Sequence, residues 1–221
     1  MTEQKGYFRV ADLAQIMRLP THTVRSWVKK YWHQADQAAL GQTTAMVKLE
    51  GIDQPYYSFL VLIELVVYFG LREAGVPPRK ISAAHRELSI AYETAHPFAH
   101  RLILDKIEVN GNDISFRTAE GTIILNGKKQ FNLPFLQNFS RQIDFGADFI
   151  ATKFWPMGKD NTIVVDPSRR FGAPLVGNTN IYPETLYQMY QAEGSVAVVA
   201  NLYEVDEAEV NDAIAFCAAA A

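Results

Sequence analysis

The chain has 221 residues, of which 48% are hydrophobic and 20% are charged, and its formal net charge is -3. This ordinary globular composition excludes wholesale disorder and leaves room for one large domain or two to three small ones. The single cysteine, Cys217, excludes an internal disulfide framework and favours a reducing compartment. The N-terminal residues lack the apolar core of a signal peptide, and we expect a cytoplasmic protein.

The net charge hides a gradient along the chain. Residues 1–104 hold 12 Lys and Arg against 9 Asp and Glu, residues 105–156 hold 6 of each kind, and residues 157–221 hold 3 against 9. A basic head and an acidic tail indicate two different partners. We predict three domains with these same bounds.

The apolar spacing of residues 10–17 predicts a first helix, which ends at Leu19-Pro20. We expect Thr21 to be the N-cap of a second helix. In that helix two stripes share the same i, i+3, i+4, i+7 spacing, one buried and one exposed. The buried stripe is Val24, Trp27, Val28 and Tyr31, and the exposed stripe is His22, Arg25, Ser26 and Lys29.

Residues 43–59 predict a short hairpin, and residues 59–74 predict a buried helix that contains Glu64 and is too short to cross a bilayer. Pro78 is expected to open a further helix. Asn-Gly pairs within residues 106–132 then predict an antiparallel meander. We expect a short helix over residues 133–145, followed by strands and turns.

Three short helices are predicted from Pro183 onward. Gly194 is expected to end the first helix, and Ser195 and Asp206 are expected to cap the other two. Around the last helix, the exposed carboxylates favour contact with protein and would be repelled by a duplex. These carboxylates are Glu204, Asp206, Glu207, Glu209 and Asp212.

The predicted fold class is therefore α+β, mostly helical. We expect an N-terminal winged helix-turn-helix over residues 1–104, a small antiparallel β region and connector over 105–156, and an acidic three-helix domain resembling a helix-turn-helix over 157–221.

The second helix has the donors that a DNA-reading helix needs. The guanidinium of an Arg can donate two hydrogen bonds to the edge of a guanine, and the ammonium of a Lys can contact phosphates. Hydroxyl groups near the start of the helix can reach the DNA backbone. From these donors and the following hairpin we predict the DNA-binding set Thr21, His22, Thr23, Arg25, Ser26, Lys29, Lys30 and Lys48. The alternative is a solvated amphipathic helix with incidental charge.

The stretches "FRVADLAQIMRLPTHTVRSWVKKYW" and "LVLIELVVYFGLREAGVPPRKI" resemble the winged helix-turn-helix of MerR-type regulators. The resemblance implies that Arg25 contacts the DNA backbone and that the hairpin is the wing. The chain departs from that pattern at "MRLPTH", where a glycine turn is more usual. Lys48 is also the only basic residue of the hairpin.

The stretch "IVVDPSRRFGAPLVGNTNIYPETLYQMYQAEGSVAVVANLYEVDEAEVNDAI" resembles a helical domain known only as a domain of unknown function, DUF433. Its hallmarks include Asp166-Pro167, Phe171-Gly172 and Gly194-Ser195, and Asn180 replaces an arginine that is usual there. Together with upstream stretches, the chain resembles the longer VapB-type antitoxins.

The antitoxin resemblance implies an autorepressor that binds its own operator as a homodimer and blocks a PIN-like ribonuclease toxin. Because PIN active sites are carboxylate clusters around a metal ion, a cation could enter them. Arg169, Arg170 and Phe171 are the predicted partner-binding residues. The alternative is that the two arginines make local salt bridges to the acidic helices.

No catalytic residue, cofactor or metal site is predicted. Pro97 disrupts the spacing of His96 and His100, and neither Ser195 nor Cys217 lies in the sequence context of a nucleophile. Two further functions stay open: a MerR-like regulator without a toxin, whose C-terminal part senses a ligand or binds another protein, and a protein-binding adaptor whose head no longer binds DNA.

Overall fold

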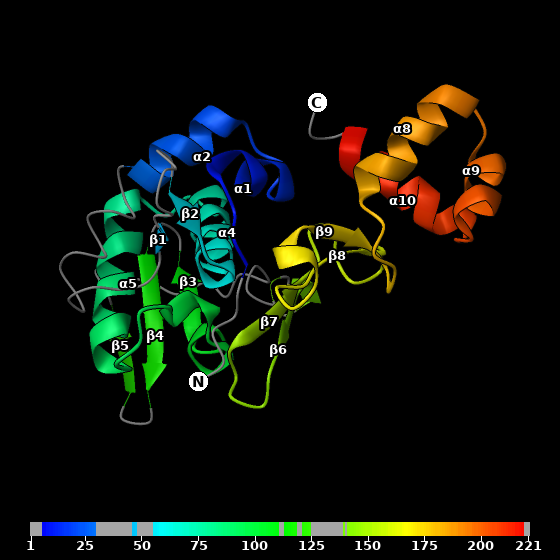
Figure 1. The fold of residues 1–221 in the computed structure, drawn as a ribbon. Helices are drawn as coiled ribbons and strands as arrows, with labels where there is room; N and C mark the ends of the chain where they lie inside the picture. Colours follow the sequence, from blue (N-terminus) through cyan, green and yellow to red (C-terminus); the bar gives the residue numbers. More distant parts are fainter. Residues whose placement is uncertain are drawn as a thin grey trace.

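The computed structural model describes residues 6–29, 46–47, 55–110, 113–118, 121–124, 139 and 141–218. Within them the chain is a mixed α+β fold, which confirms the predicted class (Figure 1). The elements of the head are α1 (Val10–Ile16), α2 (Thr21–Trp27), β1 (Met46–Val47), β2 (Tyr56–Tyr57), α4 (Phe59–Glu73) and α5 (Pro78–Ala91).

The head follows the predicted order of two helices, a hairpin and a buried helix. Strands β1 and β2 pair antiparallel, with Met46 opposite Tyr57, which confirms the hairpin, while its turn lies outside the described residues. The predicted cap at Thr21 is wrong by one residue. Thr21 is the first helical residue, and Pro20 holds the N-cap position without a side-chain hydrogen bond. Because proline lacks an N–H group, it suits the edge of a helix better than its interior.

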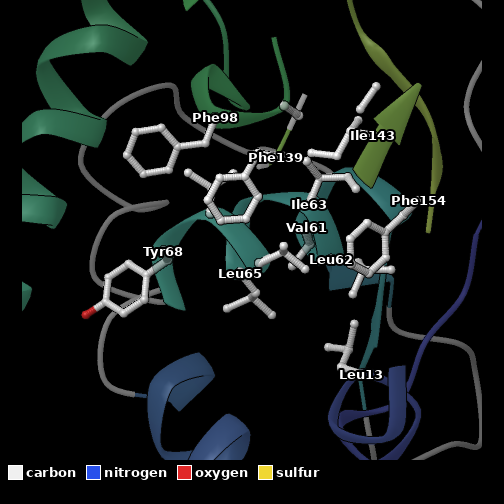
Figure 2. Packing of buried hydrophobic residues seen from close by; sticks show 14 of the residues in the cluster. Leu13, Val61, Leu62, Ile63, Leu65, Tyr68, Phe98, Phe139, Ile143 and Phe154 are labelled. Atoms are coloured by element: carbon white, nitrogen blue, oxygen red, sulfur yellow. The ribbon is translucent and has the colours of Figure 1, made fainter. Parts of the chain in front are cut away.

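Helix α4 is the centre of the larger hydrophobic core. Most of its side chains are buried, including Val61, Leu62 and Ile63 at 0% exposure. Figure 2 shows these side chains among residues from several other elements, with Leu13 of α1 on one side and Phe154 on another. The Ser58 hydroxyl caps the helix by accepting from the Val61 N–H at 3.4 Å. The head is thus built around this one helix.

The middle of the chain forms two sheets. The three-stranded sheet has the order β3-β4-β5 and is antiparallel, which confirms the predicted meander. The four-stranded sheet has the order β6-β7-β8-β9 and is also antiparallel. The elements are η2 (Pro97–Ala99), α6 (Arg101–Leu104), β3 (Ile107–Asn110), β4 (Asp113–Thr118), β5 (Gly121–Ile124), β6 (Ile143–Phe145), β7 (Ala151–Phe154), β8 (Ile163–Val165), η3 (Arg170–Gly172) and β9 (Pro174–Val176).

The helix predicted over residues 133–145 is wrong at its end. Residues 141–142 are helical, but Ile143–Phe145 is strand β6 and pairs with β7, Ile143 lying opposite Phe154. Pairing satisfies the backbone groups along β7 and buries Ile143 at 1% exposure, so tertiary contacts override the local helical preference.

The C-terminal unit consists of α8 (Pro183–Glu193), α9 (Val196–Tyr203) and α10 (Glu207–Ala218), as predicted. Gly194 ends α8 with a φ of 68°, and the Ser195 hydroxyl accepts from the Val198 N–H at 3.4 Å. These helices enclose a second core, and Figure 1 shows them at one end of the molecule. Strand β8 joins the two cores, since Ile163 packs in the second and Val165 in the first.

No helix within the described residues combines the length and apolar character that crossing a membrane requires.

Candidate nucleic-acid interface and partner-facing turn

Helix α1 positions α2 through a tight turn. Leu13 and Ile16 of α1 and Val24 of α2 are all buried, which fixes the packing of the two helices. The turn places Arg18 at a φ of 56°, and the Leu19 N–H donates to the Ala14 carbonyl at 2.9 Å. This is a helix-ending motif in which the left-handed position is usually glycine. The glycine missing from "MRLPTH" is therefore replaced by an arginine in the same conformation.

The side chains predicted to meet DNA point away from this core. His22, Arg25, Ser26 and Lys29 are exposed, whereas Thr21 and Thr23 are half-buried beside them. We call these four exposed residues the outer face of α2, where Lys29 lies on the helical residues 28–29 that continue α2 beyond Trp27. Lys30 and Lys48, the other predicted DNA contacts, lie outside the described residues. Two cations and two further polar groups on one exposed helix face can reach phosphates and base edges.

Trp27 connects α2 to the central helix. Its ring lies 5.7 Å from that of Tyr68 in an edge-on arrangement and 5.1 Å from that of Phe69, measured between centroids. Aromatic contacts of this kind add to the burial that holds two helices together. The outer face of α2 is thus presented by a helix that is anchored on its opposite side.

The N-terminal segment ties the hairpin to the head. The backbone groups of Phe8 and Tyr57 exchange two hydrogen bonds of 2.9 and 2.8 Å, so that Phe8 pairs alongside β2. The Arg9 guanidinium lies 5.8 Å from the centre of the Tyr56 ring. The base of the predicted wing is therefore fixed relative to α1 and α2.

The turn between β8 and β9 carries the predicted partner-binding residues. The buried carboxylate of Asp166 accepts from the Ser168 N–H at 2.9 Å and lies 3.6 Å from the Lys153 ammonium. The Arg169 guanidinium donates to the Gly177 carbonyl at 3.1 Å and also to the Thr179 carbonyl. Arg169 therefore stabilises the neighbouring turn by donating to backbone carbonyls, and not through salt bridges to the acidic helices.

Arg170 and Phe171 are placed differently from Arg169. Both are exposed, Phe171 at 74%, and they have positive φ angles of 44° and 57°. The Phe171 carbonyl accepts from the Tyr7 N–H at 3.2 Å. A Cβ atom on Gly172 would come within 2.7 Å of the Phe8 ring, so only glycine fits there. The fold thus holds an aromatic ring and a cation outward on a strained turn.

The acidic residues of the C-terminal unit divide into two kinds. Asp212 accepts from both the N–H and the hydroxyl of Thr162, at 2.8 and 2.9 Å, and Glu209 accepts from the Asp206 N–H at 3.0 Å. Asp206 directly precedes α10, where its cap was predicted, and the bond from its N–H to Glu209 is one half of a capping box that supports the start of the helix. Glu204, Asp206 and Glu207 have exposed side chains that remain available to a partner.

A buried acid–base pair lies inside the head and was not predicted. Glu64 accepts from the Phe98 N–H at 2.8 Å, and its second carboxylate oxygen lies 2.9 Å from the His85 Nε2 atom. The pair links α4, α5 and η2, so it serves the core. The sequence carries no signal for it beyond one glutamate in an apolar helix.

Two other titratable groups, His100 and Asp144, have pKa values shifted by their surroundings. Burial lowers the pKa of His100, and the Asp148 carboxylate acts in the opposite direction. Burial alone would raise the pKa of Asp144, but hydrogen bonds from Lys159 and Trp155 outweigh it and leave the pKa below its ordinary value. Within the described residues no group of three His, Cys, Asp or Glu side chains is placed to hold a metal ion.

Comparison with known proteins gives matches of three kinds. Residues 163–217, from β8 to α10, match the model of a family described as "Protein of unknown function (DUF433)". The Mycobacterium tuberculosis protein named "Putative antitoxin VapB45" is 21% identical over 226 residues, spanning 94% of this chain and 92% of that protein. The crystal structure of Rv2018 from M. tuberculosis aligns with a TM-score of 0.65 at 18% identity, covering 94% of this chain and 96% of that one.

The structural match shows a shared fold over almost the whole chain, and the family match is confined to its C-terminal part. The family match coincides with the second core and the strand that enters it.

Proposed function

We propose that this protein is a DNA-binding antitoxin that represses its own promoter and neutralises a PIN-like ribonuclease toxin. The observation that carries the DNA-binding part is the outer face of α2, where Arg25 and Lys29 are exposed on a helix anchored by Trp27. A helix presented in this way can enter a major groove, with its cations on phosphates or guanine. As a homodimer the protein would place two such helices on a two-fold symmetric operator.

The antitoxin part is supported by similarity to the M. tuberculosis protein that carries an antitoxin name. The toxin-facing residues we propose are Arg170 and Phe171, because the fold holds both outward while it uses Arg169 internally. A guanidinium suits the carboxylate-rich active site that PIN-like nucleases have. The exposed phenylalanine ring beside it supplies apolar contact area.

The DNA-binding part is tested by a mobility-shift titration with a fragment of the gene's own promoter. We expect Arg25→Glu combined with Lys29→Glu to weaken binding by roughly a hundredfold or more, because phosphate attraction becomes repulsion. The matched control combines Arg79→Glu with Arg86→Glu, which reverses two exposed charges on α5 and should leave binding largely unchanged. Equal affinity of the α2 variant and the parent would overturn the assignment.

The antitoxin part is tested by co-expression with the product of a toxin-sized reading frame beside this gene. The full chain should restore growth, and deletion of residues 183–221 should remove that effect. We expect Arg170→Glu combined with Phe171→Ser to reduce rescue, whereas Arg141→Glu combined with Leu102→Ser, also on exposed side chains, should not. Absence of rescue by the parent chain contradicts the antitoxin proposal.

A second candidate is a regulator that senses a small ligand and has no toxin partner. It is favoured by a cleft of about 270 Å³ where α1, α4 and β7 meet, lined by residues such as Met17, Phe69, Glu73 and Phe154. A ligand there would touch both the helix that positions α2 and the sheet. Promoter binding that persists where no toxin-sized frame lies beside the gene would favour this candidate.

A further inference from the structure

Helix α9 has an apolar outer face that the fold does not use. Its inner side chains, Val199 and Ala200, are buried in the second core. On the opposite side Val198 and Leu202, four residues apart and so neighbours on one face, are 47% and 59% exposed. We call Ala197, Val198, Asn201 and Leu202 the outer face of α9, since all four are exposed.

This pattern departs from that of an ordinary surface helix. A helix that packs on one side normally carries charged residues on the other, yet the sequence "VAVVANLY" contains no charge at all. Figure 1 shows α9 at the edge of the molecule, on the far side of the C-terminal unit from the head. Apolar side chains held together in water are typical of surfaces that bind another protein.

Charge around α9 indicates what kind of protein fits. Residues 171–221 contain 7 Asp and Glu and no Lys, Arg or His. Exposed acidic residues flank both ends of the helix, with Glu193 before it and Glu204, Asp206 and Glu207 after it. A second copy docked through the same face would bring acid against acid, which disfavours self-association there.

We infer that the outer face of α9 docks a partner protein that presents an apolar side chain surrounded by Lys and Arg. This inference rests on the proposed function, because the partner it assigns to this surface is the toxin. Val198 and Leu202 form the apolar centre of the contact, and the flanking carboxylates form its charged rim. Docking on α9 would hold the partner beside the acidic helices while Arg170 and Phe171 remain free to contact its active site.

The test measures binding of the full chain to the purified product of the neighbouring toxin-sized frame by isothermal titration calorimetry. Val198→Gln combined with Leu202→Gln removes the apolar centre and should weaken binding at least tenfold. The matched control is Ile90→Gln combined with Leu102→Gln, which changes two apolar side chains that are 61% and 43% exposed elsewhere. Circular dichroism and thermal unfolding establish that each variant folds like the parent.

The charged rim is tested separately by Glu193→Gln combined with Glu207→Gln. This variant should bind severalfold more weakly at low salt and show a smaller loss of affinity as salt is added, because fewer ion pairs remain to be screened.

The outcomes separate the inference from the function on which it rests. If the parent binds and the α9 variant binds equally well, the α9 surface is wrong and the antitoxin proposal stands. If the parent does not bind at all, both fail. If analytical ultracentrifugation shows a dimer of the parent that the α9 variant abolishes, the occupant is a second copy and the inference is overturned.

Discussion

The pairs α1–α2 and α9–α10 are two helix-turn-helix units with the same turn and different surfaces. In the first turn Arg18 has a φ of 56°, and the Leu19 N–H donates to the Ala14 carbonyl at 2.9 Å. In the second turn Glu204 has a φ of 54°, and the Val205 N–H donates to the Ala200 carbonyl at 3.0 Å. Both units therefore end their first helix with the same motif, in which glycine is replaced by a charged residue.

The exposed side chains of the two second helices differ in charge. The outer face of α2 carries Arg25 and Lys29, whereas the exposed side of α10 carries Glu207 and otherwise small or neutral residues. The inner stripes of both helices are apolar, as packing requires. The backbone motif that the two units share is therefore a property of how each unit folds. The exposed side chains of the second helix are the part that can select a partner.

The largest effect we predict concerns the reactivity of the Cys217 thiol, which α10 buries in the second core. Burial, followed by the negative charge of Glu184, raises the pKa of the Cys217 thiol to about 12. At pH 8 its reaction with a disulfide reagent should be roughly a thousandfold slower than that of a free thiol, because so little thiolate is present. Unfolding in urea should restore fast labelling.

The same shift sets a pH dependence for stability. Since the thiol pKa is higher in the folded chain than in the unfolded chain, the unfolded chain loses its proton first as pH rises. The contribution of this thiol to the free energy of unfolding is fully present below the thiol pKa of the unfolded chain. It declines as the pH rises above that pKa, from about pH 8.5 upward. Cys217→Ala should remove that decline. Rapid labelling of the native protein would show that α10 opens and exposes the Cys217 thiol.

An intermediate effect separates the structural carboxylates from the available ones. Asp212→Ala removes two hydrogen bonds to Thr162, and we expect it to lower the free energy of unfolding by about 2 to 3 kcal/mol. Glu207→Ala, at an exposed position of the same helix, should change it by less than about 0.5 kcal/mol. Urea unfolding followed by circular dichroism measures both. Equal effects would mean that the acidic residues do not divide as described.

The smallest effect tests the shared turn itself. Arg18→Gly and Glu204→Gly each relieve a positive φ angle, and each should raise the free energy of unfolding by about 0.5 to 1 kcal/mol. Similar gains at the two sites would support the equivalence of the two turns. A loss at either site would show that its side chain makes a contact worth more than the relief of strain.

The sequence predicted best those features that depend on local periodicity. The two stripes of α2 are separated by spacing alone, and Val24 and Arg25 lie as predicted, one buried and one exposed. The Ser195 cap and the Gly194 helix end were also predicted, because each depends on the chemistry of a single residue at a helix boundary.

Features that depend on distant partners were not predicted correctly. Strand β6 was expected to be helical, because its pairing with β7 cannot be read from its own residues. The Glu64–His85 pair and the Asp212–Thr162 bonds join residues far apart in the chain. Arg169 and Arg170 are neighbours in the sequence, yet only the fold turns the first inward and the second outward.

By itself, the sequence determined the α+β class, the helix faces and the charge contrast between head and tail, because periodicity and composition are properties of short segments. The tertiary structure decided which of those charged and apolar groups stay available. In the folded chain Asp212, Glu209 and Arg169 make internal hydrogen bonds. Phe171, Val198 and Leu202 remain exposed to water. A side chain is available to a partner only if the fold has given it no other contact, and that depends on segments distant in the chain.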